Sequence, residues 1–542
     1  MWILTVLWYE RGYMKNMVAS CQWEAWEQWP EGATPARVAI VTDPQLVDPH
    51  TYDRRGIVLK ATMYYSDLYM RRAWDLIQDN LVPEATFFLG DLFDGGREWG
   101  GSQATSQHLE DPHAASDWKH YKGDYWWHEF KRFESVFTPR EGRKIYRSIP
   151  GNHDLGIGDG IDQTIYNRFK TVFGMSNEEV VIGNHSFVML DSVSLTNTLN
   201  QKINSPSKNF LTKLAEGPAK LPYEPQPFSH KVHTAKEAKE VVLQKPVEPV
   251  PEREIPRILL THVPLFRQPN TDCGPLRESD RPISIHAGFQ YQNVLTSSLS
   301  TDILQSTKPI LVLAGDDHDY CEIEHKEVSP KVRELTVKSI SWTMGVRHPG
   351  FLLLSAWNPL GKTFPDADTV QTHLCLLPDQ IGIFLTYASL FGGTILLILL
   401  RALFWKVKPI SLSSSSANPP SPILPTYAVL PKPSTTTSTT LVSATSSLSG
   451  NYTYGGYGLP PTPGLPPQQQ NLIRKNREDD DNKYNKSRAV GHGALPVRVA
   501  QNIRNGWTEN WKGTRGGRAV EEVYGTAVVV LGFYAILVFI MG

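Results

Sequence analysis

Residues 310–320 read Ile-Leu-Val-Leu-Ala-Gly-Asp-Asp-His-Asp-Tyr. The first five form a continuous apolar run, which is typical of a strand covered on both faces. Three carboxylates and an imidazole follow at once, and gathering them is costly unless a metal ion, a cationic ligand or solvent neutralises the charge. The stretch therefore predicts a buried strand with a polar site at its carboxyl end.

Five similar short runs precede this one: Val38–Thr42, Thr86–Leu89, Ile145–Ile149, Ser186–Leu190 and Ile258–Thr261. Their continuous apolar character predicts strands in a layered α/β domain. Between the first two runs, apolar residues recur at helical spacing through Tyr64–Leu81 and predict a helix. Glu98–Trp127 and residues 205–256 look like insertions. The second has too few apolar residues for a core and is expected to be an exposed loop.

The 542-residue chain can hold one large domain or two ordinary ones, with appendages. Its net charge of −1 argues against nucleic-acid binding by bulk electrostatics. The charge is unevenly divided, however. Residues 401–522 carry 15 Lys/Arg and 7 Asp/Glu, a net +8, which leaves −9 for residues 1–400. Residues 409–500 are rich in Ser, Thr, Pro and Gly, a composition typical of disordered chain.

Two uncharged stretches of 20 residues, Ile381–Leu400 and Val523–Gly542, are each long enough to cross a bilayer. Basic residues flank both on the side of the intervening segment: Arg401, Lys406, Lys408, Lys512, Arg515 and Arg518. This asymmetry predicts that the linker of residues 401–522 is cytosolic and that a domain of residues 20–378 lies on the lumenal or outer side. A buried core helix is the alternative for either stretch, but neither shows an amphipathic stripe.

The first nine residues, MWILTVLWY, are apolar but too short to span a membrane. They also lack the basic start and the cleavage site of a signal peptide. Residues 1–19 are therefore interpreted as the remnant of an N-terminal membrane anchor.

All four cysteines, Cys21, Cys273, Cys321 and Cys375, fall in the predicted lumenal part, where disulfides persist. Their spacing resembles no zinc module, and four cysteines allow three pairings between which the sequence does not choose. The position of Cys273 and Cys321 beside the polar strand ends favours that pair, which leaves Cys21 with Cys375.

Polar residues follow five of the six predicted strands. They are Asp43-Pro-Gln45, Gly90-Asp91-Leu-Phe-Asp94, Gly151-Asn152-His153-Asp154, His262 and Gly315-Asp316-Asp317-His318. In open α/β sheets the carboxyl ends of strands form the ligand-binding edge, so these side chains can converge. Their oxygen and nitrogen donors suit Mn, Fe or Zn. One such motif alone is as often a turn or a helix cap, but five in order predict a metal site.

The series Asp43…Gly90-Asp91-x-x-Asp94…Gly151-Asn152-His153-Asp154…His262…Gly315-x-x-His318 resembles the calcineurin-like metallophosphoesterase pattern, D-x-H, GDxxD, GNH(D/E), H and GHxH, across residues 38–320. The resemblance implies a four-layer α/β/β/α sandwich and two divalent metals. Gln45 departs from the pattern where the family has histidine, and Asp316 replaces the first histidine of GHxH. An amide is a weaker ligand than imidazole and a carboxylate is a good hard ligand. We therefore expect a weakly held first metal and an additional anionic ligand at the second.

Carried over residue by residue, the resemblance assigns the site. Asp43, Asp91 and His318 would bind the first metal, and Gln45 could add a weak donor. The ligands of the second metal would be Asp91, Asn152, His262 and Asp316, with Asp91 bridging. His153 would stabilise the transition state or protonate the leaving group, oriented by Asp94. Asp317 and Asp319 have no part in the pattern and are expected to be solvated or to lie behind the ligands.

Six strings narrow the resemblance: VTDPQLVDPHTY, GDLFDGGREW, GNHDLGIG, CGPLRE, GDDHDYC and MGVRHPGFLLLS. They resemble the fungal ER-membrane phosphoesterases related to the mammalian post-GPI-attachment remodelling phosphoesterase, over residues 20–400. This implies removal of ethanolamine phosphate from the mannoses of GPI anchors, on a GPI glycolipid or GPI-anchored protein, with Mn²⁺ and a lumenal active site in the ER membrane. The alternatives are a catalytically weakened glycan- or cargo-binding protein and a phosphoesterase for another lumenal substrate.

Overall fold

The computed structural model describes residues 1–49, 51–52, 54, 56–99, 123–220, 254–288, 290–326, 328, 330–359, 366–404 and 515–535. The chain divides into two compact units, one made of Met1–Ile395 with Gly525–Gly542 and the other of Leu396–Tyr524. The strands and the metal centre belong to the first unit. Residues 409–500, the part of the linker predicted to be disordered, lie outside the described residues.

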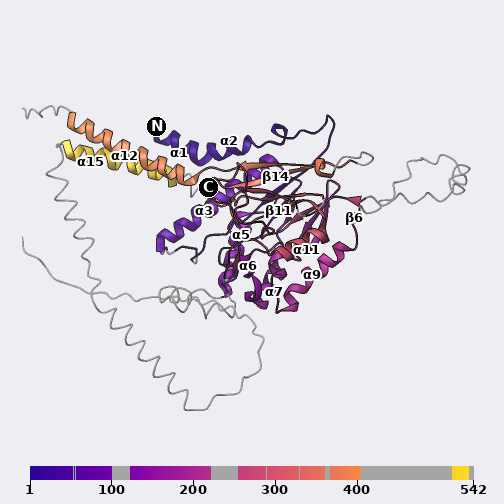
Figure 1. Ribbon diagram of the computed structural model, residues 1–542. Coiled ribbons are helices and arrows are strands. Elements are labelled where there is room, and N and C mark those ends of the chain that lie inside the picture. The colour runs from indigo at the N-terminus through magenta and orange to yellow at the C-terminus, as the bar shows by residue number, and fades with distance from the viewer. Residues whose placement is uncertain are drawn as a thin grey trace, which may run out of the picture. The chain divides into compact units, whose positions relative to one another are not determined.

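A five-stranded sheet, which contains the strand labelled β14 in Figure 1, has the order β15-β14-β1-β2-β3. Its strands are β1 (Ala36–Val41), β2 (Ala85–Phe88), β3 (Lys144–Tyr146), β14 (Gly350–Ala356) and β15 (Val370–Leu376). The strands β1, β2 and β3 are parallel, whereas β14 pairs antiparallel with both β1 and β15. Every residue of β2 and β14 is buried, which explains their continuous apolar sequence.

A six-stranded sheet has the order β12-β13-β11-β8-β5-β4. Its strands are β4 (Glu178–Ile182), β5 (His185–Met189), β8 (Arg257–Leu260), β11 (Pro309–Ala314), β12 (Cys321–His325) and β13 (Val332–Thr336). The four central strands are parallel, and β4 and β12 are antiparallel at the two edges. The six apolar runs predicted as strands are thus confirmed as β1, β2, β3, β5, β8 and β11.

The two sheets pack against each other through large apolar side chains. Phe87 of β2 stacks on Phe187 of β5, with ring centroids 5.3 Å apart. The next residue, Phe88, points to the opposite face of its sheet and contacts Trp74 and Phe133 with ring centroids 5.6 and 5.7 Å away. Each face of β2 therefore contributes to a separate buried layer.

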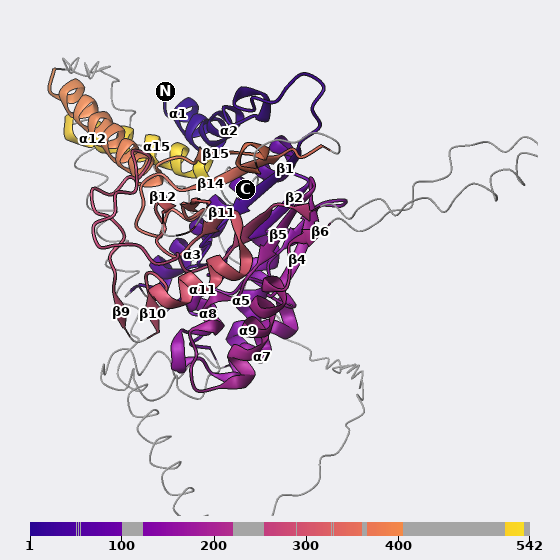
Figure 2. The ribbon, with the colours of Figure 1, turned by 45° about the vertical axis from the view of Figure 1, so that its right-hand side comes forward.

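Helices pack on the faces of the sheets. Those of the described part include α2 (Tyr13–Ala19), α3 (Gly56–Leu76), α5 (Gly123–Val136), α7 (Gln163–Phe173), α9 (Gln201–Ala215) and α11 (Ser297–Thr307). Figure 2 shows α7, α9 and α11 grouped together, while α2 lies by β15, which it contacts. Helices on mixed sheets confirm the predicted α/β class.

Several predicted boundaries are wrong. The third predicted strand, Ile145–Ile149, ends earlier, at Tyr146. The insertion predicted over Glu98–Trp127 ends too late, because α5 begins at Gly123; its residues 100–122 and residues 221–253 of the second insertion lie outside the described residues.

The helix predicted over Tyr64–Leu81 begins earlier, at Gly56, and continues as the π-helical segment η3 (Ile77–Leu81). The insertion predicted over residues 205–256 also starts too early, because residues up to Ala215 belong to α9. Only a sparse stripe of α9, which includes Leu211 and Leu214, is buried, so the polar average composition hid a real helix.

Both favoured disulfides are confirmed. Cys21 and Cys375 join the segment after α2 to β15, with Cα atoms 5.8 Å apart. Cys273 and Cys321 join a loop to the first residue of β12, with Cα atoms 4.3 Å apart. The second bridge lies directly after the acidic stretch at residues 316–319.

One described helix, α12 (Gln380–Phe404), is long and apolar enough to cross a membrane, and it contains the predicted span Ile381–Leu400. Its apolar side chains are largely exposed, Leu396 and Leu397 by 57% and 65%, which argues against a core helix of a soluble protein. The helix α15 (Arg515–Ala535) covers the first part of the predicted second span, and residues 536–542 lie outside the described range.

Candidate metal centre

The side chains predicted to bind metal converge although they come from five separate loops. Asp43, Asp91 and His318 offer ligand atoms that all lie within 4.8 Å of one another. Asp91, His262 and Asp316 form a second such group. Because Asp91 belongs to both, the structure places a shared carboxylate between two neighbouring groups, as the predicted bridging ligand requires.

The loops that carry these residues have an unusual backbone. Ten non-glycine residues of the described part have positive φ, and five are Asp43, Gln45, Asp91, Asp316 and His318, with φ of 47°, 33°, 51°, 69° and 66°. Non-glycine residues rarely adopt this conformation. When it occurs it clusters at functional sites, where the surrounding structure holds it in place.

Two motif glycines allow the loops to approach closely. A Cβ atom at Gly151 would lie 1.9 Å from Asp91 Oδ1, and one at Gly90 would lie 2.6 Å from His262 Nδ1. Gly90 also has a φ of 95°, which other residues adopt only with strain. A larger residue at either position would displace a side chain of the metal centre.

His262 is buried, and both of its ring nitrogens have defined partners. Nδ1 donates to the carbonyl of Leu89 at 2.7 Å. Nε2 faces oxygens of Asn152, Asp91 and Asp316 at 3.1, 3.4 and 3.5 Å. Burial lowers the pKa of His262, but Asp91 and Asp316 raise it well above its usual value. An imidazolium therefore supplies positive charge here, and its proton must leave when a metal binds.

The first group contains a buried carboxylate oxygen that needs a partner. Oδ1 of Asp43 accepts a hydrogen bond from the Asp316 N–H at 3.2 Å, whereas Oδ2 has no partner among the described residues. Burial raises the pKa of Asp43 to about 6, although His318 opposes this. His318 Nδ1 donates to the carbonyl of Met344 at 3.1 Å, so Nε2 is free to be a ligand. These residues fit a divalent cation, which would satisfy Asp43 Oδ2.

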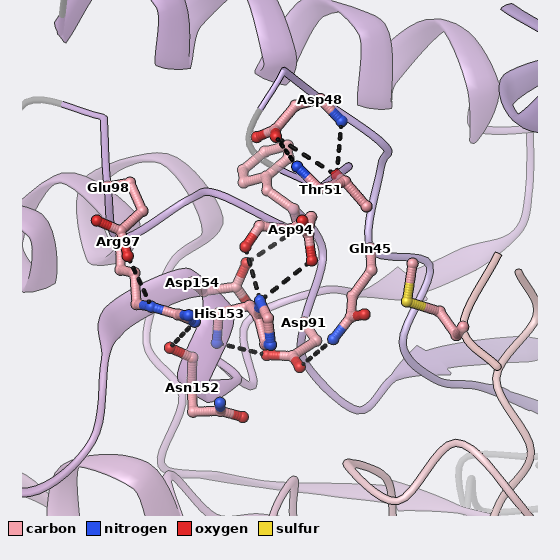
Figure 3. Close-up of polar contacts among 12 residues, drawn as sticks. Gln45, Asp48, Thr51, Asp91, Asp94, Arg97, Glu98, Asn152, His153 and Asp154 are labelled. Atoms are coloured by element: carbon pink, nitrogen blue, oxygen red, sulfur yellow. Dashed lines mark hydrogen bonds and ion pairs between the residues drawn. The ribbon is translucent and has the colours of Figure 1, made fainter. Parts of the chain in front are cut away.

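Gln45 turns its amide nitrogen toward the shared carboxylate. Nε2 donates to Asp91 Oδ2 at 2.7 Å (Figure 3). Gln45 therefore orients Asp91 through a hydrogen bond, and an amide N–H is not a metal ligand. Its additional role as a weak oxygen donor stays a prediction.

His153 and Asp94 lie together near Asp91, the carboxylate that the two ligand groups share (Figure 3). His153 Nδ1 is 2.7 Å from the Asp94 carbonyl oxygen and 3.3 Å from Asp94 Oδ1. Burial and Arg97 lower the pKa of His153, but Asp91 and Asp94 outweigh them and raise it to about 9. The ring is thus an imidazolium at neutral pH, fixed at Nδ1, with Nε2 able to give a proton.

Asp154, to which the sequence pattern assigned no role, joins two loops of the site. Its buried carboxylate accepts from the backbone N–H groups of Leu92, Phe93 and Gly151 at 3.0, 3.2 and 2.9 Å. This fixes the loop that carries Asp91 against the one that carries Asn152. Asp154 is the last residue of the GNHD motif. The motif therefore marks Asp154 as a site residue, but it does not reveal the backbone hydrogen bonds that explain its role.

Arg97 was also missed. It donates from Nη1 to the Asn152 carbonyl at 3.0 Å, and its backbone N–H donates to the His153 carbonyl at 2.8 Å (Figure 3). Both acceptors are backbone oxygens, which every residue possesses, so the sequence could not predict these contacts. Arg97 therefore holds the segment that carries a proposed ligand and the proposed acid.

Of the two environments expected for Asp317 and Asp319, the second is confirmed, because both lie behind the ligands and pair with cationic side chains. Asp317 pairs with Arg277. Asp319 is 2.7 Å from Lys338 Nζ, and only 4% of it is exposed. Two carboxylates of the acidic stretch are thus neutralised by cationic side chains, and Asp316 remains for a metal.

We expect Asp316→Ala to lower metal occupancy of the second group, and with it the rate, because the group loses an anionic ligand. The affinity should fall at least roughly 10-fold, and excess Mn²⁺ should restore part of the rate. Asp317→Ala is the matched control, since it breaks only the pair with Arg277. Metal analysis and a rate for each variant test this, and equal metal content in Asp316→Ala and the parent would show that the assignment is wrong.

The raised pKa of His153 predicts a pH dependence. The protonated ring is the active form of an acid, and Asp91 contributes to its raised pKa of about 9. Cations held by Asp91 would cancel that contribution and lower the pKa of His153. We therefore expect the hydrolysis rate of the metal-loaded protein to fall as the pH rises through a value below about 9, and this limb to disappear in His153→Ala. A pH–rate profile of both proteins checks it, and a limb that persists in the variant would contradict the assignment.

No family model matches the chain, but curated relatives do. Cell division control protein 1 of Saccharomyces cerevisiae is 36% identical over 391 residues, which cover 70% of this chain and 68% of that protein. Metallophosphoesterase 1 of Rattus norvegicus is 28% identical over 64% of this chain and 79% of its own length. The Ailuropoda melanoleuca protein of the same name is 26% identical over 69% and 82%.

In the structure, two groups of Asp and His side chains that could hold metal ions share one carboxylate, that of Asp91. The name Metallophosphoesterase describes the chemistry that such a centre can perform. The chain accordingly belongs to the calcineurin-like metallophosphoesterases, in the family of Cell division control protein 1 and Metallophosphoesterase 1, and is a metal-dependent hydrolase of phosphate esters.

Proposed function

We propose that the protein removes ethanolamine phosphate from a mannose of GPI anchors in the ER. The observation that supports a phosphodiesterase is the pair of ligand groups that share Asp91. Two divalent ions in such an arrangement suit displacement at phosphorus. The GPI substrate comes from the six strings quoted above, whose resemblance to the ER-membrane phosphoesterases extends over residues 20–400.

The proposed ligands are Asp43, Asp91 and His318 for the first ion and Asp91, Asn152, His262 and Asp316 for the second. When bound, the two ions would offset the negative charge of the phosphodiester and lower the pKa of a water molecule so that it can attack phosphorus. The second group offers three oxygens and one nitrogen, which favours a hard ion such as Mn²⁺, with Fe and Zn as alternatives.

His153 is the proposed acid. Asp94 fixes its Nδ1 side, so Nε2 can protonate the mannose oxygen as the bond between phosphorus and that oxygen breaks. The products are ethanolamine phosphate and a free mannose hydroxyl. Arg97 and Asp154 keep His153 and Asn152 in place through backbone contacts.

We also propose that the domain of residues 20–378, a four-layer α/β/β/α sandwich, is lumenal. Two disulfides support an oxidising compartment. Residues 381–400 and 523–542 would span the ER membrane, residues 401–522 would be cytosolic, and residues 1–19 would complete the anchor. In support of the last point, Trp2 Nε1 donates to Thr394 Oγ1 of α12 at 3.0 Å.

Protease treatment of sealed microsomes should spare the domain and cut the linker, and the opposite pattern would refute this topology.

The proposed substrate is tested by profiling GPI glycans in cells that lack the protein. An additional ethanolamine phosphate should accumulate, and the parent protein should remove it whereas His153→Ala should not. An unchanged profile, with hydrolysis of other phosphodiesters by the purified protein, would identify a different lumenal substrate. Full rescue by His153→Ala would favour the glycan- or cargo-binding alternative.

A further inference from the structure

The loop of residues 341–349 lies between the metal centre and the start of α12. The carbonyl of its Met344 accepts the hydrogen bond from His318 Nδ1 at 3.1 Å, so this loop orients the ring of a proposed metal ligand. We propose that the loop couples the membrane helix to the metal centre, so that affinity for the first metal depends on contacts between the loop and α12. The inference rests on the ligand set of the proposed function and concerns positioning residues.

Two side chains of the loop contact the first turns of α12. Arg347 pairs with Asp379, whose Oδ1 also caps α12 by accepting from the Gly382 N–H at 2.8 Å. Trp342 packs edge-on against Phe384, with ring centroids 5.8 Å apart. An ion pair to the helix cap and an aromatic contact thus attach the loop to the beginning of the membrane helix.

The start of α12 is in turn held by the N-terminal segment of residues 1–19 and by α3 of the catalytic domain. Tyr387 Oη donates to Glu10 Oε1 at 2.9 Å, and Glu10 also pairs with Arg72 at 2.8 Å. Gln380 Nε2 donates to Tyr65 Oη at 3.3 Å. These contacts fix the position of the first two turns of α12, and the loop of residues 341–349 packs against these turns.

The loop is short, and hydrogen bonds also fix it on the side away from α12. Few of its residues can therefore adjust when Arg347 moves. Met344 and Arg347 are three residues apart, and their Cα atoms can be at most about 11 Å from each other. The carboxylate of Glu278 accepts from the N–H groups of Arg347 and His348 at 2.6 and 3.0 Å. The carbonyl of Thr343 accepts from a tyrosine hydroxyl at 2.6 Å. Moving Arg347 therefore shifts the Met344 carbonyl.

The first metal is the one expected to respond. His318 is the imidazole of its ligand group, and Gln45 turns its nitrogen toward Asp91, so the group has no second nitrogen ligand to compensate. The imidazole of the second group, His262, is oriented by the Leu89 carbonyl instead. The second metal thus serves as an internal control for the coupling.

The test is a Mn²⁺ titration of the full-length protein in lipid nanodiscs, which needs no substrate. In an Asp316→Ala background the second group is weakened, so the titration should report mainly on the first group. Asp379→Asn keeps a capping side chain but removes the charge. We expect it, and Arg347→Gln, to raise the Kd of the first metal roughly twofold to fivefold, the range open to a half-exposed ion pair. Arg347→Lys should restore most of the affinity.

Arg140→Gln is the matched control, because Arg140 is also a partly exposed arginine, paired with Asp75 and Asp79 away from the loop. It should leave the Kd of both metals unchanged. In the protein that keeps Asp316, Asp379→Asn and the two Arg347 variants should leave the Kd of the second metal unchanged. Three results would overturn the proposal: the affinity for both metals falls equally, the affinity for the first metal falls no more than in Arg140→Gln, or the parent binds no Mn²⁺. Tight binding with normal coupling but an unchanged GPI profile would refute only the proposed substrate.

Discussion

Asp91→Asn is expected to remove both metals together and to reduce kcat/KM by at least about 10⁴-fold, because the chemistry depends on both ions. Asp91 is the residue that the two ligand groups share. The amide keeps the shape of the side chain but loses the charge that must face two cations. Metal analysis and phosphodiester hydrolysis measure the two effects side by side.

The control is Asp75→Asn, which removes a partly exposed carboxylate that pairs with Arg140 outside the site. It should keep both metals and full activity. Loss of only one ion per chain in Asp91→Asn would show that Asp91 does not bridge. Unchanged metal content would show that the ligand groups of the structure are not the metal site.

His153→Ala should lower kcat by roughly 10²–10⁴-fold and leave the metal content unchanged, because this residue gives a proton and binds no metal in the proposed mechanism. The structure also predicts how the rate of Asp94→Asn should compare with that of His153→Ala. The closer partner of His153 Nδ1 is the backbone carbonyl of Asp94, which survives Asp94→Asn. We therefore expect Asp94→Asn to cost much less than His153→Ala, roughly 10-fold.

Rates and metal content of both variants decide this prediction. If His153→Ala loses a metal ion, the residue is a ligand and not the acid. If Asp94→Asn equals His153→Ala in rate, the carboxylate rather than the carbonyl orients the ring, and the hydrogen bond at 2.7 Å is less important than its length indicates.

Four of the five strands that lead to the metal-bearing loops, β1, β2, β8 and β11, were predictable because they are almost wholly buried on both faces, whereas β3 is partly exposed. Continuous apolar runs such as Ile258–Leu260 and Leu311–Ala314 identify them, and parallel strands deliver their following residues to one edge. The edge strand β12 was not predicted. It alternates buried and exposed residues and carries Glu322 and Glu324, so no apolar run marks it.

The site was predictable as far as side-chain types carry information. Carboxylates and imidazoles at strand ends identified the ligand candidates, but the orientation of Gln45 depends on one hydrogen bond to Asp91. The pairing of Asp319 with Lys338 joins distant segments, so neither residue alone reveals it. Met344 acts through its backbone carbonyl, which any residue possesses, so no sequence pattern could have found its contact with His318.

If two metal ions share Asp91, electron paramagnetic resonance of the Mn²⁺-loaded full-length protein should detect their interaction. Two ions held by one carboxylate lie about 3.5–4 Å apart in two-metal sites and are magnetically coupled. We therefore expect a coupled spectrum at two equivalents of Mn²⁺ and, in Asp316→Ala, the signal of isolated ions at one equivalent. Two bound ions in the parent with uncoupled spectra, or a single bound ion, would contradict a shared Asp91.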